Sequence, residues 1–267
     1  MASIVPQNLL DFTKDADIHI ALACFVGEPE YKNYTEFFQK KRKSDSFLIM
    51  DNGVIEGKPM PFAECVKRAE LINADEIVLP DVYKDHTGTY NAIKEAIEYA
   101  LKYNFFGYRF RFMAVPQGDS MEDWIACAEE IIRDFGMYIS TIGIPKHLVD
   151  TCKERDARLI AISNLHDKVP NLDEWDIHLL GCWRTPLEVL MCTKASEQGI
   201  IPTIRSCDSA IPYVYARNGM RFSDDDRPDT DPIDFKKGHC NKILLAYNNA
   251  AWVSIGDPNA ERSIYFL

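Results

Sequence analysis

Short apolar runs that end in a polar residue or a glycine recur along this chain, and segments of helical periodicity separate them. The end residues of six runs lie between 26 and 38 positions apart, about the length of one strand followed by one helix. They are Asp51, Asp81, Gln117, Gly143, Gly181 and Asp208. Strands that alternate with helices form parallel βαβ units, so the pattern predicts a fold of the α/β class.

Two α/β architectures are compatible with this alternation, a closed (β/α)8 barrel and an open doubly wound sheet. Open sheets commonly carry a glycine-rich phosphate-binding fingerprint or a P-loop, and neither follows any of the apolar runs. The polar end residues also occupy the carboxyl ends of their strands, where (β/α)8 barrels place their active sites. We therefore predict a (β/α)8 TIM-type barrel, with residues 1–267 in a single domain.

Seven strands are predicted directly from the apolar runs. They lie in residues 18–24, 47–51, 76–80, 109–115, 138–142, 176–180 and 200–208. A barrel needs an eighth strand, and residues 158–163 and 252–255 are both candidates for it. Residues 222–239 are predicted to form an acidic loop, because five aspartates fall in its first ten positions and it contains two prolines.

Helix signals occupy the intervals between the strands. Apolar residues at positions 62, 65, 66, 69 and 72 form one stripe of an amphipathic helix. Ser120, with Asp123 three residues later, is a predicted N-cap of the capping-box type. Thr185 and Pro186 are predicted to begin a further helix, which Gly199 ends.

The composition, 46% hydrophobic and 27% charged, is ordinary for a globular protein. No run of 18 apolar residues is present, and no apolar segment follows a basic N-terminus, so we expect a soluble cytoplasmic protein without membrane contact. The eight cysteines are scattered singly, without a Cys-x-x-Cys pair, which predicts reduced thiols and no zinc knuckle.

A net charge of −11 argues against a broadly basic nucleic-acid surface, because phosphate affinity comes mainly from Lys and Arg. Local basic groups remain candidates for phosphate contacts. They are residues 40–43, the residues from Lys236 to His239, and the arginines near the last strand, Arg205, Arg217 and Arg221. The three arginines are the stronger candidates, since they flank the end residue Asp208.

Three kinds of site chemistry can be weighed from the residues. The six histidines include no His-x-His or His-Glu-x-x-His pattern, which disfavours metal-dependent hydrolysis. Cys207 would point away from Asp208 in a strand, which disfavours a catalytic thiol. Carboxylate chemistry remains, and Asp51, Asp81 and Asp208 at one barrel end suit glycosyl transfer. A purely structural role for Asp51 and Asp81, as caps of the following helices, stays open.

Six short motifs occur in an order and approximate spacing that resemble those of a known enzyme family. They are Asp51-Asn52-Gly53, residues 77–81, Val115-Pro116-Gln117-Gly118, Ile142-Gly143-Ile144, residues 179–181 followed by Thr185-Pro186, and Cys207-Asp208 followed by residues 216–219. Over about residues 47–219 the chain resembles the tRNA-guanine transglycosylase superfamily. That resemblance implies a (β/α)8 barrel and a pentosyltransferase that exchanges guanine for a 7-deazaguanine in a nucleic acid.

The resemblance also implies a role for each matching residue. Asp208 resembles the nucleophile that forms a covalent glycosyl-enzyme, and Asp51 resembles the general acid/base. The implied base-binding residues are Asp81, Gln117, Gly143, Ile144 and Gly181. Asp81 resembles the carboxylate that accepts from the guanine N1–H and 2-amino group. Gln117 and the Gly143 amide resemble the donors to O6, and the Ile144 backbone resembles a contact on the side of the 7-substituent. This agrees with the chemistry of a guanine edge, which presents two neighbouring donors and one acceptor.

The chain departs from the tRNA enzymes of this family at several points. Their Cys-x-Cys-x-x-Cys and His zinc site is missing, with only His239 and Cys240 in that region, so no metal or other cofactor is expected. Ile55 stands where the family has an aromatic residue, and the length leaves no appended RNA-binding domain. These features resemble the compact phage-type DNA transglycosylases, whose partners would be DNA and a free base such as 7-cyano-7-deazaguanine.

Three alternatives stay open on the sequence. One is a zinc-free transglycosylase that acts on tRNA, and another is a non-catalytic partner subunit of such an enzyme. The third is a barrel hydrolase unrelated to nucleic acids.

Overall fold

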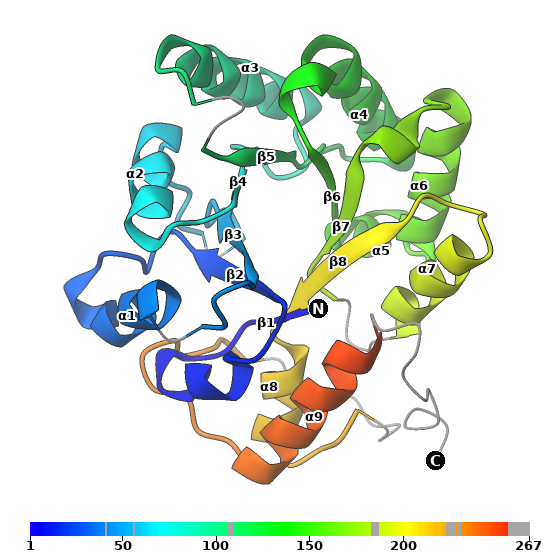
Figure 1. Ribbon diagram of the computed structural model, residues 1–267. Helices are drawn as coiled ribbons and strands as arrows, with labels where there is room; N and C mark the ends of the chain where they lie inside the picture. The colour runs from blue at the N-terminus through cyan, green and yellow to red at the C-terminus, as the bar shows by residue number, and fades with distance from the viewer. Residues whose placement is uncertain are drawn as a thin grey trace.

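Eight parallel strands form one sheet in the part of the chain that the computed structural model describes, residues 1–40, 42–55, 57–105, 109–182, 187–222, 228 and 231–255. The order of the strands in the sheet is β1-β8-β7-β6-β5-β4-β3-β2. Their bounds are β1 Ala2–Ser3, β2 Ile18–Leu22, β3 Phe47–Asp51, β4 Glu76–Val78, β5 Arg111–Ala114, β6 Thr141–Pro145, β7 Asp176–Leu180 and β8 Ile204–Ser209. β1 also lies beside β2, so the sheet is nearly closed into a (β/α)8 TIM-type barrel (Figure 1).

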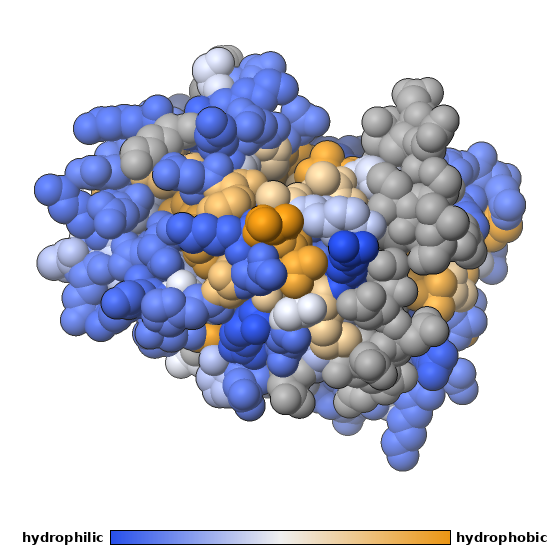
Figure 2. Space-filling view, turned by 90° about the horizontal axis from the view of Figure 1, so that it is seen from below, coloured by the Kyte–Doolittle hydropathy of each residue, from blue (hydrophilic) through white to orange (hydrophobic). Residues whose placement is uncertain are grey.

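Helices surround this barrel. They are α1 Lys32–Lys40, α2 Phe62–Ile72, α3 His86–Lys102, α4 Met121–Phe135, α5 His147–Cys152, α6 Ala157–Lys168, α7 Leu187–Glu197, α8 Ile211–Arg217 and α9 Lys242–Ile255. Short 3-10 helices cover Gln7–Thr13, Pro29–Tyr31, Gly136–Tyr138 and Leu172–Glu174. The flank in Figure 2 presents many hydrophilic side chains, with a group of hydrophobic ones near its centre.

The strands separate two apolar cores. Alternate strand residues point to opposite faces of a sheet, so Leu48 and Met50 of β3 pack outward against the helices. Ile49 points inward, where it packs with Val78 and Met113 from the next two strands. The barrel interior is thus filled by side chains at its middle, and polar residues occupy both ends.

The position of the eighth strand corrects the sequence prediction. Both candidate segments are helical, since residues 158–163 lie in α6 and residues 252–255 end α9. The eighth strand is Ala2–Ser3, and Ala2 pairs with Asp208 of β8. Two residues are too few to show strand alternation. A distant contact helps to hold them, because Trp252 Nε1 donates to the Ala2 carbonyl at 2.9 Å.

Several local predictions are confirmed. All five stripe residues of α2 are buried, and the Ser120 hydroxyl accepts from the Asp123 amide at 3.1 Å at the start of α4. Gly199 follows α7 with a φ of +70°, a left-handed conformation that glycine adopts without strain. Thr185 and Pro186, predicted to start this helix, lie outside the described residues.

The predicted acidic loop, residues 222–239, is described only in part. Its described part, Phe222, Pro228 and residues 231–239, contains neither helix nor strand. Among the described helices, none combines the length and the apolar character needed to cross a bilayer.

Candidate active site

A cavity of about 1390 Å³ opens at the carboxyl ends of the strands. Its lining includes five of the seven residues predicted for catalysis and base binding, namely Asp51, Asp81, Gln117, Gly181 and Asp208. Residues 231–236, from the predicted acidic loop, line it as well. The parallel strands explain this convergence, because their carboxyl ends meet at one end of the barrel.

Asp208 is the most deeply placed of these carboxylates, with 5% of its surface exposed. Its Oδ1 accepts two hydrogen bonds, from His178 Nε2 at 3.0 Å and from the Gly181 amide at 3.2 Å. Its Oδ2 has no hydrogen-bond partner among the described residues. One oxygen of this buried carboxylate is therefore held by the protein, and the other remains available to a bound molecule.

Gly181 is suited to hold Asp208 because of its backbone conformation. It directly follows β7 with a φ of +68°, a left-handed turn that favours glycine. A Cβ at this position would come within 2.8 Å of the Lys146 side chain. Both observations favour glycine here, and the resulting turn directs the Gly181 amide at Asp208.

Asp81, just beyond β4, is held by two side-chain amides. Asn52 Nδ2 donates to Oδ1 at 2.7 Å, and Gln117 Nε2 donates to Oδ2 at 2.6 Å. Both amides are themselves fixed, since Asn52 also donates to the Leu79 carbonyl and Gln117 Oε1 accepts from the Lys84 amide. Burial raises the pKa of Asp81 to about 6, and the two amide donors oppose this rise.

Asp51 ends β3 and stabilises the turn that follows it. Its Oδ2 accepts from the Gly53 amide at 3.0 Å, an Asx-type contact. Gly53 has a φ of +80°, and a Cβ there would lie 2.7 Å from the Lys58 carbonyl oxygen. Asp51 is therefore a turn-stabilising residue that also lines the cavity. It is not the cap of the next helix, which begins only at Phe62.

Gly143 and Ile144 do not line the cavity, which corrects their predicted place. The predicted strand ended before Gly143, whereas β6 runs to Pro145. Both residues consequently lie inside the strand. The side chains of Leu180 and Val115 fill the space in front of Gly143, and Ile144 is buried in the outer core with its carbonyl accepting from Arg158.

The three predicted phosphate-binding arginines are not among the cavity-lining residues either. Arg205 lies at the amino end of β8 and forms an ion pair with Glu76. Both side chains are therefore at the barrel end opposite the cavity. Arg217 ends α8 and donates to the Asp231 carbonyl at 3.1 Å. Arg221 stacks over the Tyr247 ring at 5.3 Å. Closeness to Asp208 in the sequence did not place these side chains beside it.

Sequence reasoning missed several residues that the structure brings to the cavity. Lys58 and Lys146 line it although neither was predicted, and Lys236, from the predicted basic group Lys236 to His239, lines it as well. Tyr83 lines it too and packs edge-on against His147, whose pKa burial lowers to about 4. His178 contacts Asp208 from the neighbouring strand. Its position two residues before Leu180, on the inward face of β7, was the signal that could have identified it.

A catalytic thiol and a metal centre are the two other chemistries that the residue types raise. Cys207 is fully buried in the outer core, on the opposite face of β8 from Asp208, and burial raises the pKa of its thiol. Among the described residues, no group of three or more His, Cys, Asp or Glu side chains is arranged to hold a metal ion. A scan against protein-family models and a search of curated proteins both find no match to this sequence.

Proposed function

We propose that this protein is a base-exchange glycosyltransferase that replaces guanine in DNA with a 7-deazaguanine, such as 7-cyano-7-deazaguanine. The observation that carries the proposal is the asymmetric environment of Asp208. A carboxylate nucleophile needs one oxygen fixed in place and the other directed at the reacting carbon. Oδ1 of Asp208 has two donors, and Oδ2 has none among the described residues.

In the proposed reaction, Asp208 Oδ2 attacks C1′ of the target nucleotide. The bond between C1′ and N9 of guanine breaks, and guanine leaves with a proton from Asp51. The incoming deazaguanine then gives its N9 proton to Asp51, and N9 attacks C1′ to release Asp208. Two displacements give net retention at C1′, the pattern of glycosyl transfer through a covalent intermediate.

The environment of Asp81 supports recognition of a guanine edge. A carboxylate can accept from both N1–H and the 2-amino group, because each oxygen offers two lone pairs. In the unliganded protein the side-chain amides of Asn52 and Gln117 donate hydrogen bonds to this carboxylate. A guanine that displaced the Gln117 amide would free that amide to donate to O6. A base lacking these groups would leave buried partners unpaired, which lowers its reaction rate.

The walls and rim of the cavity support a nucleic-acid substrate. A base inside a duplex must leave its stack before its C1′ can be attacked, so the cavity must hold a flipped nucleotide. Its volume of about 1390 Å³ exceeds what a single base requires. Tyr83, whose side chain is half exposed, offers an aromatic ring to a base, and Lys58 and Lys146 offer charge to phosphates.

The decisive experiment offers labelled guanine and labelled 7-cyano-7-deazaguanine to duplex DNA, single-stranded DNA and tRNA in parallel. Incorporation into DNA, with a denaturation-resistant protein–DNA adduct, is the expected result. Incorporation into tRNA alone would replace the DNA substrate by the tRNA alternative. Release of free base without incorporation would indicate a hydrolase, and no exchange on any of the three nucleic acids would overturn the proposal.

A further inference from the structure

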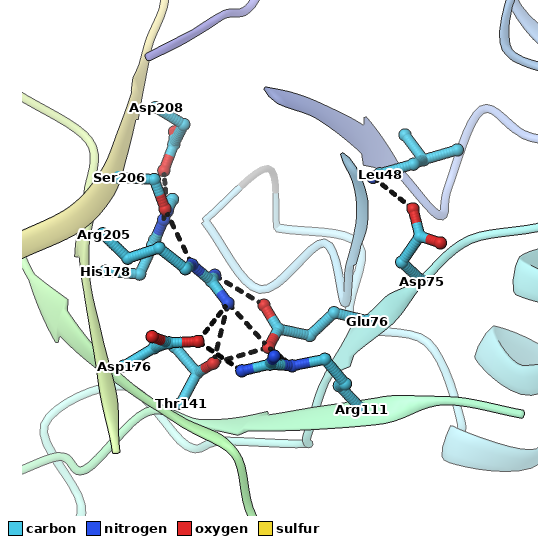
Figure 3. Close-up of polar contacts among 10 residues, drawn as sticks. All are labelled: Leu48, Asp75, Glu76, Arg111, Thr141, Asp176, His178, Arg205, Ser206 and Asp208. Atoms are coloured by element: carbon cyan, nitrogen blue, oxygen red, sulfur yellow. Dashed lines mark hydrogen bonds and ion pairs between the residues drawn. The ribbon is translucent and has the colours of Figure 1, made fainter. Parts of the chain in front are cut away.

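A chain of hydrogen bonds crosses the barrel interior and ends at Asp208 (Figure 3). It begins at Arg205, whose Nε donates to Ser206 Oγ at 3.2 Å. Ser206 Oγ lies 2.7 Å from His178 Nδ1, and His178 Nε2 lies 3.0 Å from Asp208 Oδ1. His178 has no exposed surface, so bulk water does not compete for either ring nitrogen.

The two ends of this chain fix the direction of every hydrogen bond in it. A guanidinium only donates, so Ser206 accepts from Arg205 and has its own O–H left to give. Among the described residues His178 Nδ1 is the acceptor within hydrogen-bond distance of that O–H, and a proton on Nδ1 would leave the buried O–H unpaired, so the arrangement favours an unprotonated Nδ1. A carboxylate only accepts, so Nε2 must carry the proton that Asp208 receives. The chain is self-consistent with a neutral imidazole in its Nε2–H tautomer.

Arg205 is anchored firmly enough to start this chain. Its Nη2 donates to Glu76 Oε2 at 2.7 Å, and its Nη1 donates to Glu76 Oε1 at 3.1 Å, a two-pronged ion pair. Thr141 Oγ1 accepts from the same Nη1 at 3.0 Å. Glu76 is fully buried, and planar guanidinium groups suit such buried pairs.

An irregularity in the sheet brings Arg205 into the interior. Ile177 of β7 pairs with Ile204, but the next residue, His178, pairs with Ser206, so β8 holds one extra residue at this point. A bulge of this kind redirects a side chain and is frequent beside active sites. Here the extra residue is Arg205, which forms ion pairs with Glu76 and Asp176 at the amino end of the barrel.

We infer that His178 is a positioning residue for Asp208, and that Ser206 and Arg205 hold it in the Nε2–H tautomer. This inference rests on the proposed role of Asp208 as the nucleophile. A proton on Nε2 binds Oδ1 and leaves Oδ2 for C1′ of the substrate. The other tautomer would set the Nε2 lone pair against Oδ1, and the carboxylate would turn away from its reactive orientation.

The tautomer is tested first, in the unliganded protein, because this readout does not depend on activity. Nitrogen NMR of ¹⁵N-histidine-labelled protein distinguishes a protonated from an unprotonated ring nitrogen, and a His178→Gln variant assigns the signal. The expected result is a proton on Nε2 and none on Nδ1. In Ser206→Ala the signal of Nδ1 should shift, because its donor is lost. A proton on Nδ1 of the unmodified protein would overturn the inference.

The kinetic test uses a matched pair of variants at the same position. In His178→Gln the side-chain amide reaches the place of Nε2 and still donates to Asp208, whereas in His178→Asn it reaches only the place of Nδ1. We expect kcat to fall about tenfold to a hundredfold in the Asn variant, the effect of one lost hydrogen bond to a charged group. The Gln variant should keep kcat within about threefold, and KM for guanine should change little in either.

Equal losses in the two variants would show a merely structural role and overturn the inference. His86→Gln is the control for a histidine substitution, since His86 contacts Asp123 and Glu130 of α4 away from the cavity lining. If the unmodified protein exchanges no base, the proposed function fails, and the tautomer measurement still decides the placement of the proton.

Discussion

The two ends of the barrel hold the same residue types in opposite arrangements. At the amino end, the buried Glu76 is paired with Arg205, and Asp176 is paired with both Arg205 and Arg111 (Figure 3). At the carboxyl end, Asp81 and Asp208 receive their hydrogen bonds from two side-chain amides, one backbone amide and one imidazole. Cations neutralise the acids at one end, and neutral donors hold them at the other.

This difference separates a structural from a chemical use of carboxylates. An acid whose oxygens are bound by arginines has little capacity left for a substrate, and its removal leaves a buried cation without a partner. An acid held by neutral donors keeps its charge uncompensated, and its remaining lone pairs can bind or attack. The contrast predicts that replacing an acid at the amino end mainly lowers stability, whereas replacing one at the carboxyl end mainly lowers activity.

The largest effect should follow from Asp208→Asn. The amide side chain keeps the shape of the carboxylate but is a poor nucleophile, so base exchange should fall by about a thousandfold or more. Incorporation of labelled base and gel detection of the covalent adduct measure this loss. Asp17→Asn is the control at the amino end, because the Asp17 side chain pairs with the exposed Lys43 at the surface. Retained exchange in Asp208→Asn would contradict its proposed role.

Glu76→Gln tests the amino end of the comparison. The variant keeps the size of the side chain but leaves Arg205 without its buried counter-charge, so the free energy of unfolding should fall by about 3 kcal/mol. Urea denaturation followed by circular dichroism measures this change. The matched control is Glu64→Gln, whose partly exposed carboxylate pairs with Lys67 and Arg68 on α2 and should contribute less than about 1 kcal/mol. Equal losses in the two variants would remove the distinction between the ends.

The two ends also differ in how far the sequence predicted them. Asp81 and Asp208 were predicted because each ends a recognisable apolar run, and the register of parallel strands then brings such ends together. Arg205 was misplaced because its position depends on a bulge, which pairs His178 with Ser206 in place of Arg205. No local pattern in the sequence marks that extra residue.

Tertiary contacts explain the other errors. β1 forms because Ala2 and Ser3 pair with β8, and a two-residue strand has no period of its own. The end of β6 was predicted before Gly143 because glycine often marks a turn. In the structure the missing side chain instead makes room for Leu180 and Val115 inside the barrel. The fold class thus follows from periodicity, while strand ends depend on packing between distant segments.

Asp81→Asn should have an intermediate effect, which falls on the binding of guanine rather than on the chemical step. An amide cannot accept from both guanine donors, so guanine affinity should fall about tenfold to a hundredfold, as for a lost hydrogen bond to a charged group. Because the pKa of Asp81 is raised to about 6, guanine affinity of the unmodified protein should also fall as the pH drops below that value. Calorimetric titration with guanine across this range should show no such decrease in Asp81→Asn.

The same raised pKa has a consequence for stability, with a definite sign. The pKa of Asp81 is about 6 in the folded protein and near its ordinary value of 3.8 in the unfolded chain, so the folded state binds more protons between these values. Stability therefore decreases as the pH rises through this window. Asp81→Asn removes that cost and should unfold at a higher urea concentration at neutral pH. A less stable variant would assign Asp81 a structural role.

The smallest effect should come from Lys146→Ala at the rim of the cavity. Lys146 is exposed, follows β6 directly and lines the cavity beside Gly181. If it contacts one phosphate, its removal should lower the slope of log affinity against log salt for DNA by about 1, with guanine affinity unchanged. Lys168→Ala is the control, since Lys168 pairs with Glu129 of α4. An unchanged salt slope would mean that Lys146 contacts no phosphate.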